Sequence, residues 1–376
     1  MDFSYSDEQL AVGELARQIF QDKTSPESMR ALEKEEGPRF DPELWSALSE
    51  SGLIGIAVPE EQSGGGLGFL EVAVILEQLA HATAPVPLYE TMVLGALPLA
   101  EFGTEAQRER WLPGLGEGSV IMTAALEEAG ADPLVPTTRA AGKGDGFVLN
   151  GEKISVPAAP IADLILIPAS FEDGGVGVFV VESSAPGLEI EPVETTTRQP
   201  EAIVRLRDVT VDGESRLGAD TAGEDLLAWI RLRATAALCA MTAGVCDAAL
   251  QLTAEYVKTR KQFDQPIAMF QAVGHRAADA YIDAETVRLT AQQAVWRIAE
   301  GRASESQVAV AKFFASEAGN RVLLAAQHLH GGVGVDRDYP LHRYYLYAKQ
   351  LELTLGGGTE QLRELGRMLA SDSSTF

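Results

Sequence analysis

The stretch LILIPASFEDGGVGVFVV, residues 164–181, decides the central part of the fold. Its two apolar runs, 164–167 and 176–181, are short and rich in β-branched side chains, which is typical of strands buried in a sheet. The pair Asp173-Gly174 lies between them and is a turn signal. We therefore expect two short antiparallel strands here rather than a helix.

The same pattern of short apolar runs and turn residues extends to both sides of this stretch. Another short apolar run covers residues 147–149, and the turn pairs Asp145-Gly146 and Asn150-Gly151 bound it. The helical period of 3.6 residues fades near residue 120 and returns shortly after residue 222. We therefore predict a β domain of short antiparallel strands over residues 121–222.

Helical patterns flank this β domain. Ser6 is a predicted N-cap, and Asp41-Pro42 opens a helix that has apolar residues on one face. Further helices are predicted over residues 226–260, 266–300, 304–330 and 359–369. The sequence thus predicts an α+β fold with an N-terminal helical domain (1–120), the β domain (121–222) and a C-terminal helical bundle (223–376).

Charge excludes one broad class of function. The net charge of −25 argues against a nucleic-acid-binding protein. The charge is uneven, because residues 223–376 hold 16 of the 30 basic residues and are almost neutral. A polyanionic ligand would find its partners most easily in this last segment.

The sequence also carries signals about compartment. The segment MDFSYSDEQL has no basic or apolar leader region, and no apolar run reaches the roughly 18 residues of a membrane span. Cys239 and Cys246 lie two helical turns apart, too far for a disulfide, so we expect reduced core thiols. These features predict a cytoplasmic protein without a membrane or secretory segment.

Common catalytic motifs are missing from the sequence. It has no dinucleotide-binding or Walker glycine loop, no Cys-x-x-Cys, no His-x-x-x-His and no Gly-x-Ser-x-Gly elbow. We therefore expect no metal site. Any chemistry must come from a bound cofactor or from scattered residues.

Two stretches could contact such a cofactor. Residues 256–267 end a long helix in three basic residues, an aromatic residue and a proline; they form either a phosphate clamp or a simple complement to the helix dipole. Residues 328–334, His-Leu-His-Gly-Gly-Val-Gly, form either a close approach to a ligand or an ordinary glycine cap. Physical chemistry alone leaves both alternatives open.

Together these stretches resemble the acyl-CoA dehydrogenase family. The resemblance rests on Arg-x-x-Phe with Pro-Ile-x-x-Phe-Gln at 260–271, on Gly-Gly-x-Gly at 331–334, and on Val58-Pro59-Glu60 with Gly64-Gly65. It covers nearly the whole chain and implies N-terminal helices, a middle β-barrel or sandwich and a C-terminal four-helix bundle. The combination is most similar to subunits of actinobacterial heterotetrameric members that act on the steroid side chain.

The resemblance implies a reaction and a cofactor. In this family a glutamate removes the α proton of an acyl-CoA while FAD takes the β hydride, and electron-transfer flavoprotein accepts the electrons. Each FAD lies at a subunit interface, where the second subunit lends residues to the pyrophosphate and adenosine. The lent residues implied for this chain are Arg260, Gln262, Phe263, Phe270, Gln271, His328, Gly331 and Gly332.

The chain departs from the family at both usual positions of the base. Gly357 stands where the carboxylate is expected in the segment before the last helix, and Leu232 occupies the alternative position before Arg233. Neither side chain can remove a proton. Glu352 and Glu360 flank the glycine run, either as a solvated helix face or as a relocated base.

The implied flavin contacts are altered as well. The loop Glu127–Pro133 is shorter than its family counterpart and lacks the threonine, and we expect Glu127 and Glu128 to face the flavin. Ser155 and Pro157 replace the tryptophan and threonine of the family. Asp264 replaces a glycine, which leaves the tightness of that turn open.

Three hypotheses follow from this pattern. The chain is the non-catalytic subunit of a heteromeric FAD-dependent enzyme (α2β2 with a catalytic subunit), a self-sufficient enzyme with a relocated base, or a non-enzymatic binding protein. Loss of the base together with the flavin contacts, while the lent residues persist, favours the first hypothesis.

Overall fold

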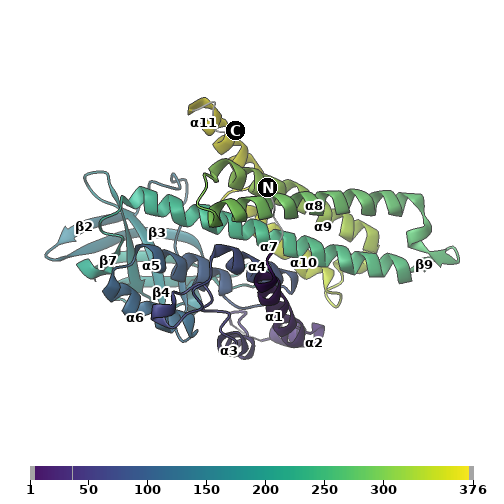
Figure 1. Cartoon of the computed structure of the whole chain (residues 1–376), viewed down its shortest axis with the longest axis horizontal. Coiled ribbons are helices and arrows are strands. Elements are labelled where there is room, and N and C mark those ends of the chain that lie inside the picture. Colours follow the sequence, from purple (N-terminus) through teal and green to yellow (C-terminus); the bar gives the residue numbers. More distant parts are fainter. Residues whose placement is uncertain (1–4, 36, 372–376) are drawn as a thin grey trace. The chain divides into compact units, whose positions relative to one another are not determined.

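The computed structural model describes residues 5–35 and 37–371 and shows strands in the middle of the chain with helices on either side, which confirms the α+β prediction (Figure 1). The chain forms two compact units. The bundle unit comprises residues 1–30, 73–84 and 235–376, and the sheet unit comprises 31–72 and 85–234. The predicted domain boundaries at 120 and 222 remain a prediction.

The sheet unit is built on one eight-stranded sheet in the order β6-β7-β3-β2-β4-β5-β8, with β1 beside β4. The predicted pair is confirmed, because β4 and β5 are antiparallel and Leu164 is opposite Glu182. Two pairings correct the antiparallel expectation, since β4 runs parallel to both β1 and β2. The strands are β1 (Met122–Ala124), β2 (Arg139–Lys143), β3 (Gly146–Pro157), β4 (Leu164–Ser170), β5 (Val176–Glu182), β6 (Leu188–Val193), β7 (Glu201–Asp212) and β8 (Arg216–Leu217).

One predicted turn is wrong. Asn150-Gly151 lies inside the 12-residue strand β3, at a register shift against β7. The Asn150 side chain bonds to Asp208 on β7 across this bulge. A Cβ atom on Gly151 would lie 2.5–2.8 Å from Thr138, so glycine permits a close strand approach here rather than a turn.

The sheet buries one face in an apolar core that Phe179, Ile165 and Val204 share. Helices of the same unit include one π-helix, η2, whose residues other than Glu90 are buried. The helices here are α3 (Pro42–Glu50), η2 (Tyr89–Ala96), α5 (Leu97–Phe102) and α6 (Glu105–Gly116). As predicted, Asp41 caps α3, because its carboxylate accepts from the backbone of Glu43 and Leu44.

Long helices make up most of the bundle unit. Ser6 caps α1 through a capping box with Gln9, as expected. Helix α8 begins at Gln271, later than predicted, because residues 261–269 form a short hairpin and a 3-10 turn. Helix α10 was not predicted. The remaining helices are α1 (Asp7–Lys23), α2 (Pro26–Leu32), α4 (Phe69–His81), α7 (Gly223–Thr259), α8 (Gln271–Ala299), α9 (Glu305–His330), α10 (Leu341–Leu353) and α11 (Gly358–Ser371).

Helix α7 corrects one expectation about apolar runs. By length and composition it could cross a membrane, but 78% of its apolar window is buried inside the protein, as in the core helix of a soluble protein. Cys239 and Cys246 lie on α7 as buried free thiols, which confirms that they form no disulfide. Burial raises the pKa of each thiol to about 12.

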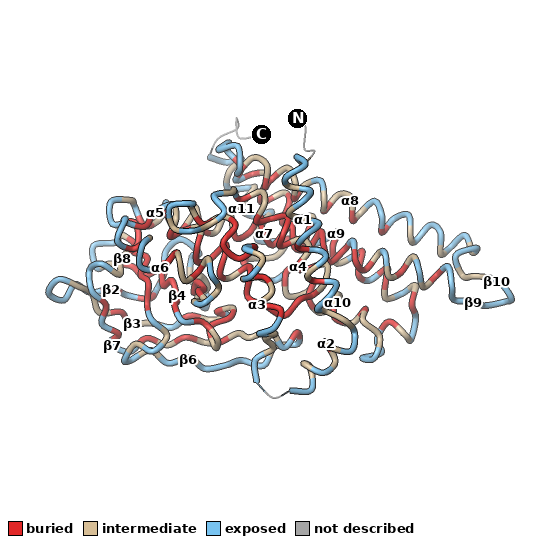
Figure 2. The backbone as a smooth tube through the Cα atoms, turned by 60° about the horizontal axis from the view of Figure 1, so that its bottom comes forward, coloured by how far each residue is buried: buried red, intermediate tan, exposed pale blue. Residues whose placement is uncertain are grey.

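One side of α8 leaves large apolar side chains in solvent. Tyr281, Ile282 and Leu289 are 60%, 62% and 48% exposed, and their spacing places them on one helical face. We call these three residues the α8 apolar face. Figure 2 shows that many residues of α8, above all in its first half, are exposed.

Candidate functional site

The first predicted stretch folds as a tight hairpin at the end of α7 (Figure 1). Strands β9 (Lys261–Gln262) and β10 (Gln265–Pro266) pair antiparallel across a two-residue turn. Phe263 and Asp264 both adopt left-handed backbone angles, with φ of 53° and 63°. This is the geometry of a type I′ turn. The turn is therefore tight although Asp264 replaces glycine, and aspartate tolerates this conformation better than most residues.

The hairpin presents its side chains to solvent. Phe263 is 88% exposed and meets the edge of Phe270, with ring centroids 6.2 Å apart. Gln262 donates its side-chain amide to the backbone of Lys261, and Gln271 is exposed at the first position of α8. These four predicted residues thus lie together around one turn.

Arg260 is fixed through its backbone and exposed at its side chain. Its N–H donates to Tyr256 O and its carbonyl accepts from Ile267 N, both at 2.8 Å. Of the three basic residues, only Lys258 lies inside the last turn of α7, where it pairs with Glu255. Arg260 lies beyond the helix, so its guanidinium is available to an anion.

The second predicted stretch follows α9. Gly331 has a φ of 62° and donates its N–H to carbonyls of the last turn, so it is a glycine C-cap. Among the described residues, apart from the chain neighbours, no heavy atom lies within 4 Å of a Cβ placed on Gly331 or Gly332. His328 is exposed on the last turn of α9. The cap accounts for Gly331, and open space beside both glycines leaves their backbone accessible to a ligand.

Three rings, which we call the three-ring cluster, join these two stretches. Tyr256 on α7 stacks on His330 at the end of α9, with centroids 4.3 Å apart and planes at 25°. His330 Nε2 lies 3.0 Å from the hydroxyl of Tyr339. This cluster was not predicted from the sequence. Its only sign was a second histidine beside the glycine turn, and sequence spacing does not bring residues 256, 330 and 339 together.

The Gly357 position has space but no functional group. Gly357 directly precedes α11, and a Cβ atom there would meet its nearest neighbours at 3.6 Å and 3.8 Å, an ordinary contact. The carboxylate of Glu352 pairs with Lys349 at 2.5 Å. Glu360 is exposed, 3.9 Å from Arg363. Each flanking acid thus faces a cation on its own helix. Glu360 fits a solvated helix face, whereas the Glu352 side chain is only 22% exposed.

The alternative base position is apolar. Leu232 is half-buried on α7. The next residue, Arg233, stacks its guanidinium 3.6 Å from the ring centroid of Trp229. Burial lowers the pKa of Arg233 to about 10, so it remains a cation at neutral pH.

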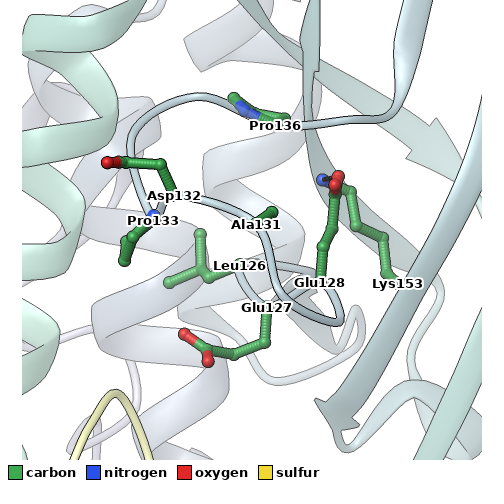
Figure 3. A pocket seen from close by; sticks show the side chains of 8 residues that line it. All are labelled: Leu126, Glu127, Glu128, Ala131, Asp132, Pro133, Pro136 and Lys153. Carbon is green, nitrogen blue, oxygen red and sulfur yellow. Dashed lines mark hydrogen bonds and ion pairs between the residues drawn. The ribbon is translucent and has the colours of Figure 1, made fainter.

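The two acids of the 127–133 loop are both paired with cations of the protein itself, and the expectation that they face a flavin remains a prediction. Glu128 points toward Lys153 (Figure 3), with Oε1 2.6 Å from Nζ, and it also accepts from the backbone and hydroxyls of Thr137 and Thr138. Burial alone would raise the pKa of Glu128, but these hydrogen bonds outweigh it and hold the pKa at about 2. The carboxylate is therefore a structural anion.

Glu127 points the other way from the same loop (Figure 3). Its carboxylate pairs with Arg231 on α7 at 2.9 Å. The pocket under this loop has a volume of about 20 Å³, room for about one water molecule. Ser155 is exposed at a β-bulge with a φ of 46°, and Pro157 O accepts from Thr123. This loop pocket does not fit a flavin ring, and neither Ser155 nor Pro157 offers an aromatic face.

No group of three or more potential metal ligands occurs within residues 5–35 and 37–371.

Comparison with known proteins assigns the chain to a family. Family models match the N-terminal domain of acyl-CoA dehydrogenase over residues 6–119, its middle domain over 122–207 and its C-terminal domain over 229–369. The acyl-CoA dehydrogenase FadE27 of Mycobacterium tuberculosis is 42% identical over 98% of this chain and 99% of its own. The chain belongs to the acyl-CoA dehydrogenase family. The earlier resemblance is thereby confirmed.

Solved structures of heteromeric enzymes are similar over the full length. A chain of the ChsE4-ChsE5 complex from M. tuberculosis matches with a TM-score of 0.93 and 42% identity, over 99% of this chain and all of that one. A chain of a variant of the Tcur3481-Tcur3483 steroid acyl-CoA dehydrogenase matches with a TM-score of 0.91 and 42% identity, over 98% of this chain and 99% of that one.

Relatives of this fold are flavoproteins. The FAD complex of PigA matches with a TM-score of 0.91 and 27% identity, covering 98% of this chain and 99% of that one. FAD is thus a cofactor of the family.

Proposed function

We propose that this chain is the non-catalytic subunit of a heteromeric, FAD-dependent acyl-CoA dehydrogenase. It lends an arm to the FAD of a catalytic partner, in an α2β2 assembly. The arm consists of Arg260, Gln262, Phe263, Phe270, Gln271, His328, Gly331 and Gly332. The enzyme would form a double bond between the α and β carbons of an acyl-CoA thioester.

The observation that carries the proposal is an asymmetry within one chain. Both base positions hold residues that cannot accept a proton, Gly357 and Leu232. In contrast, the hairpin that carries Arg260 and Phe263 is a tight, exposed turn that is open to a ligand. A chain that had lost all function in FAD binding would have no use for a guanidinium and an aromatic ring held on such a turn.

The residues of the arm suit the ADP half of FAD. The guanidinium of Arg260 can donate two hydrogen bonds to pyrophosphate oxygens. The ring of Phe263 offers a flat apolar face, and the open backbone at Gly331 and Gly332 allows close approach. FAD itself would supply the hydride acceptor. The proton acceptor must then belong to the partner, because this chain has none at either position.

The similar proteins support finer parts of the proposal. Two of the matched structures are heteromeric complexes, and one of them is a steroid acyl-CoA dehydrogenase. We infer a steroid side-chain CoA ester as the substrate and electron-transfer flavoprotein as the acceptor. We also infer a cytoplasmic location, since α7 is a buried core helix.

Co-expression tests the proposal. We would purify the chain alone and together with a candidate catalytic acyl-CoA dehydrogenase subunit, then measure FAD by absorbance and turnover with a steroid side-chain CoA ester. We expect a colourless, inactive chain alone and a yellow, active complex. Stoichiometric FAD and turnover by the chain alone would instead support a self-sufficient enzyme, with Glu352, Glu360 and Glu128 as the first acids to mutate. A complex that forms but needs nothing from Arg260 would support a binding role.

A further inference from the structure

The two halves of the arm come from different helices. One half, the hairpin with Arg260, follows the C-terminus of α7, and the other, the turn with Gly331, follows the C-terminus of α9. Both halves are exposed, and a ligand that contacts both needs them at a fixed separation. The three-ring cluster lies directly behind both halves, because Tyr256 precedes Arg260 by one helical turn and His330 adjoins Gly331.

His330 is the central member of this cluster. It is 3% exposed, stacks on Tyr256 and tilts against Tyr339, with ring centroids 5.1 Å apart. Its Nδ1 lies 2.8 Å from the carbonyl of Ala326, which can only accept, so this nitrogen carries a proton. Burial lowers the pKa of His330 below its ordinary value, which favours the neutral ring. Nε2 is then the acceptor for the hydroxyl of Tyr339.

Tyr339 connects the cluster to a third segment. It lies between the glycine turn and α10, and its N–H donates to Asp336 O while its carbonyl lies 2.7 Å from His342 Nδ1. His330 therefore holds three elements at once: α7 by ring stacking, α9 by its own backbone, and the segment before α10 by a side-chain hydrogen bond. A phenylalanine could keep the stack but neither hydrogen bond.

We propose that His330 is a positioning residue that holds the two halves of the arm at the separation required by the ADP half of FAD. This inference rests on the proposed function. His330 does not touch the ligand in this view, because its ring is buried and both ring nitrogens are occupied. It acts through Tyr256 and Tyr339.

The test uses the co-expressed heteromeric complex, freed of FAD, with three probes. FAD and ADP report on the arm, whereas FMN, which lacks the ADP half, reports on the partner's flavin site. The variants are His330→Phe and Tyr339→Phe, with Tyr345→Phe, a half-buried tyrosine outside the cluster, as the matched control. Calorimetry gives each dissociation constant, and thermal melting reports on folding.

We expect His330→Phe, which removes two buried hydrogen bonds, to weaken FAD and ADP binding by the same factor, roughly 5- to 15-fold. Tyr339→Phe should cause a smaller loss of the same kind. FMN affinity should stay within about twofold, and Tyr345→Phe should change nothing. If His330→Phe proves unstable, Tyr339→Phe decides alone, because it keeps every ring.

Two results would overturn the inference. Unchanged ADP and FAD affinity in both variants, while Arg260→Ala still weakens them, would show that the arm works without this cluster. An equal loss of FMN affinity with a lower melting temperature would show a general role in folding. If Arg260→Ala also leaves FAD affinity unchanged, the proposed function fails rather than this inference.

Discussion

The ammonium group of Lys153 lies 2.6 Å from the carboxylate of Glu128, and the two side chains are only 1% and 4% exposed. Lys153 also donates to the carbonyl of Pro168 at 2.7 Å. The pair therefore joins the 127–133 loop, β3 and β4 inside the sheet unit. Removing each charged group from water costs free energy, and the attraction of its buried partner compensates that cost.

Lys153→Met should destabilise the protein by about 3–5 kcal/mol, since it leaves the Glu128 carboxylate buried without its cation. Urea unfolding at pH 7 measures this change. Lys143→Met, an exposed lysine on the neighbouring strand β2, is the control and should stay within about 0.5 kcal/mol. A similarly small effect of Lys153→Met would show that the pair contributes little.

The same pair has a defined pH dependence. The folded pKa of Glu128 is about 2, below its ordinary value of 4.5, so its stabilisation is present above about pH 4.5 and is lost as the pH falls toward 2. The difference in unfolding free energy between wild type and Lys153→Met should therefore shrink over this window. A constant difference from pH 6 to pH 3 would contradict the assignment.

Arg260→Ala should weaken FAD binding by the heteromeric complex roughly 10- to 150-fold, because a charge-assisted bond to phosphate contributes about 1.5–3 kcal/mol. Calorimetry on the complex measures this, and Lys261→Ala is the matched control on the adjoining strand residue. Helical content of the isolated chain should not change. If Arg260→Ala leaves FAD affinity unchanged, the phosphate-clamp interpretation is wrong, and the basic residues only complement the helix dipole.

Adjacent glycines before α11 should respond differently to alanine. Gly357→Ala should cost less than about 0.5 kcal/mol, since its Cβ has ordinary contact distances. Gly356 has a φ of 93°, so Gly356→Ala should cost about 1–3 kcal/mol. Chemical denaturation of both variants tests this, and equal costs would contradict the described backbone. A small cost of Gly357→Ala would show that this position can hold a side chain although the chain has glycine there.

Glu77→Gln should stabilise the protein at pH 8 but not at pH 4. Burial, with a contribution from Asp247, raises the folded pKa of Glu77 to about 7. Its unfolded pKa is near 4.5, so stability falls as pH rises from about 4.5 to 7 and stays lower above it. We expect a gain of about 1–3 kcal/mol at pH 8 in urea unfolding. Glu109→Gln, an exposed acid, should show no pH-dependent gain.

Patterns local in sequence were predictable, and contacts distant in sequence were not. The strand pair 164–181 and the cap at Ser6 depend on periodicity and neighbouring residues, and both were found. The bulge at Gly151 was misread because its cause is Thr138, which approaches from another part of the chain. Within the candidate site, motif spacing indicated Arg260 and Gly331 but not His330, whose partners lie 74 and 9 residues away.

Buried charges were the least predictable feature. Glu128 looked like a free acid in the sequence, yet Lys153, 25 residues away, neutralises it. Lys312 is 1% exposed and donates to carbonyls at the end of α10, although the sequence showed only a lysine in a helix. A pattern of residue types cannot reveal a pairing that depends on tertiary structure.

The α8 apolar face has a consequence for how long the protein persists in the cell before it is degraded. Tyr281, Ile282 and Leu289 remain exposed when the bundle unit is complete, so folding alone does not hide them. Chaperones and proteases recognise such surfaces. In the proposed heteromer, a partner that covers this face would protect the chain from them, and a copy made in excess of that partner would be cleared from the cell.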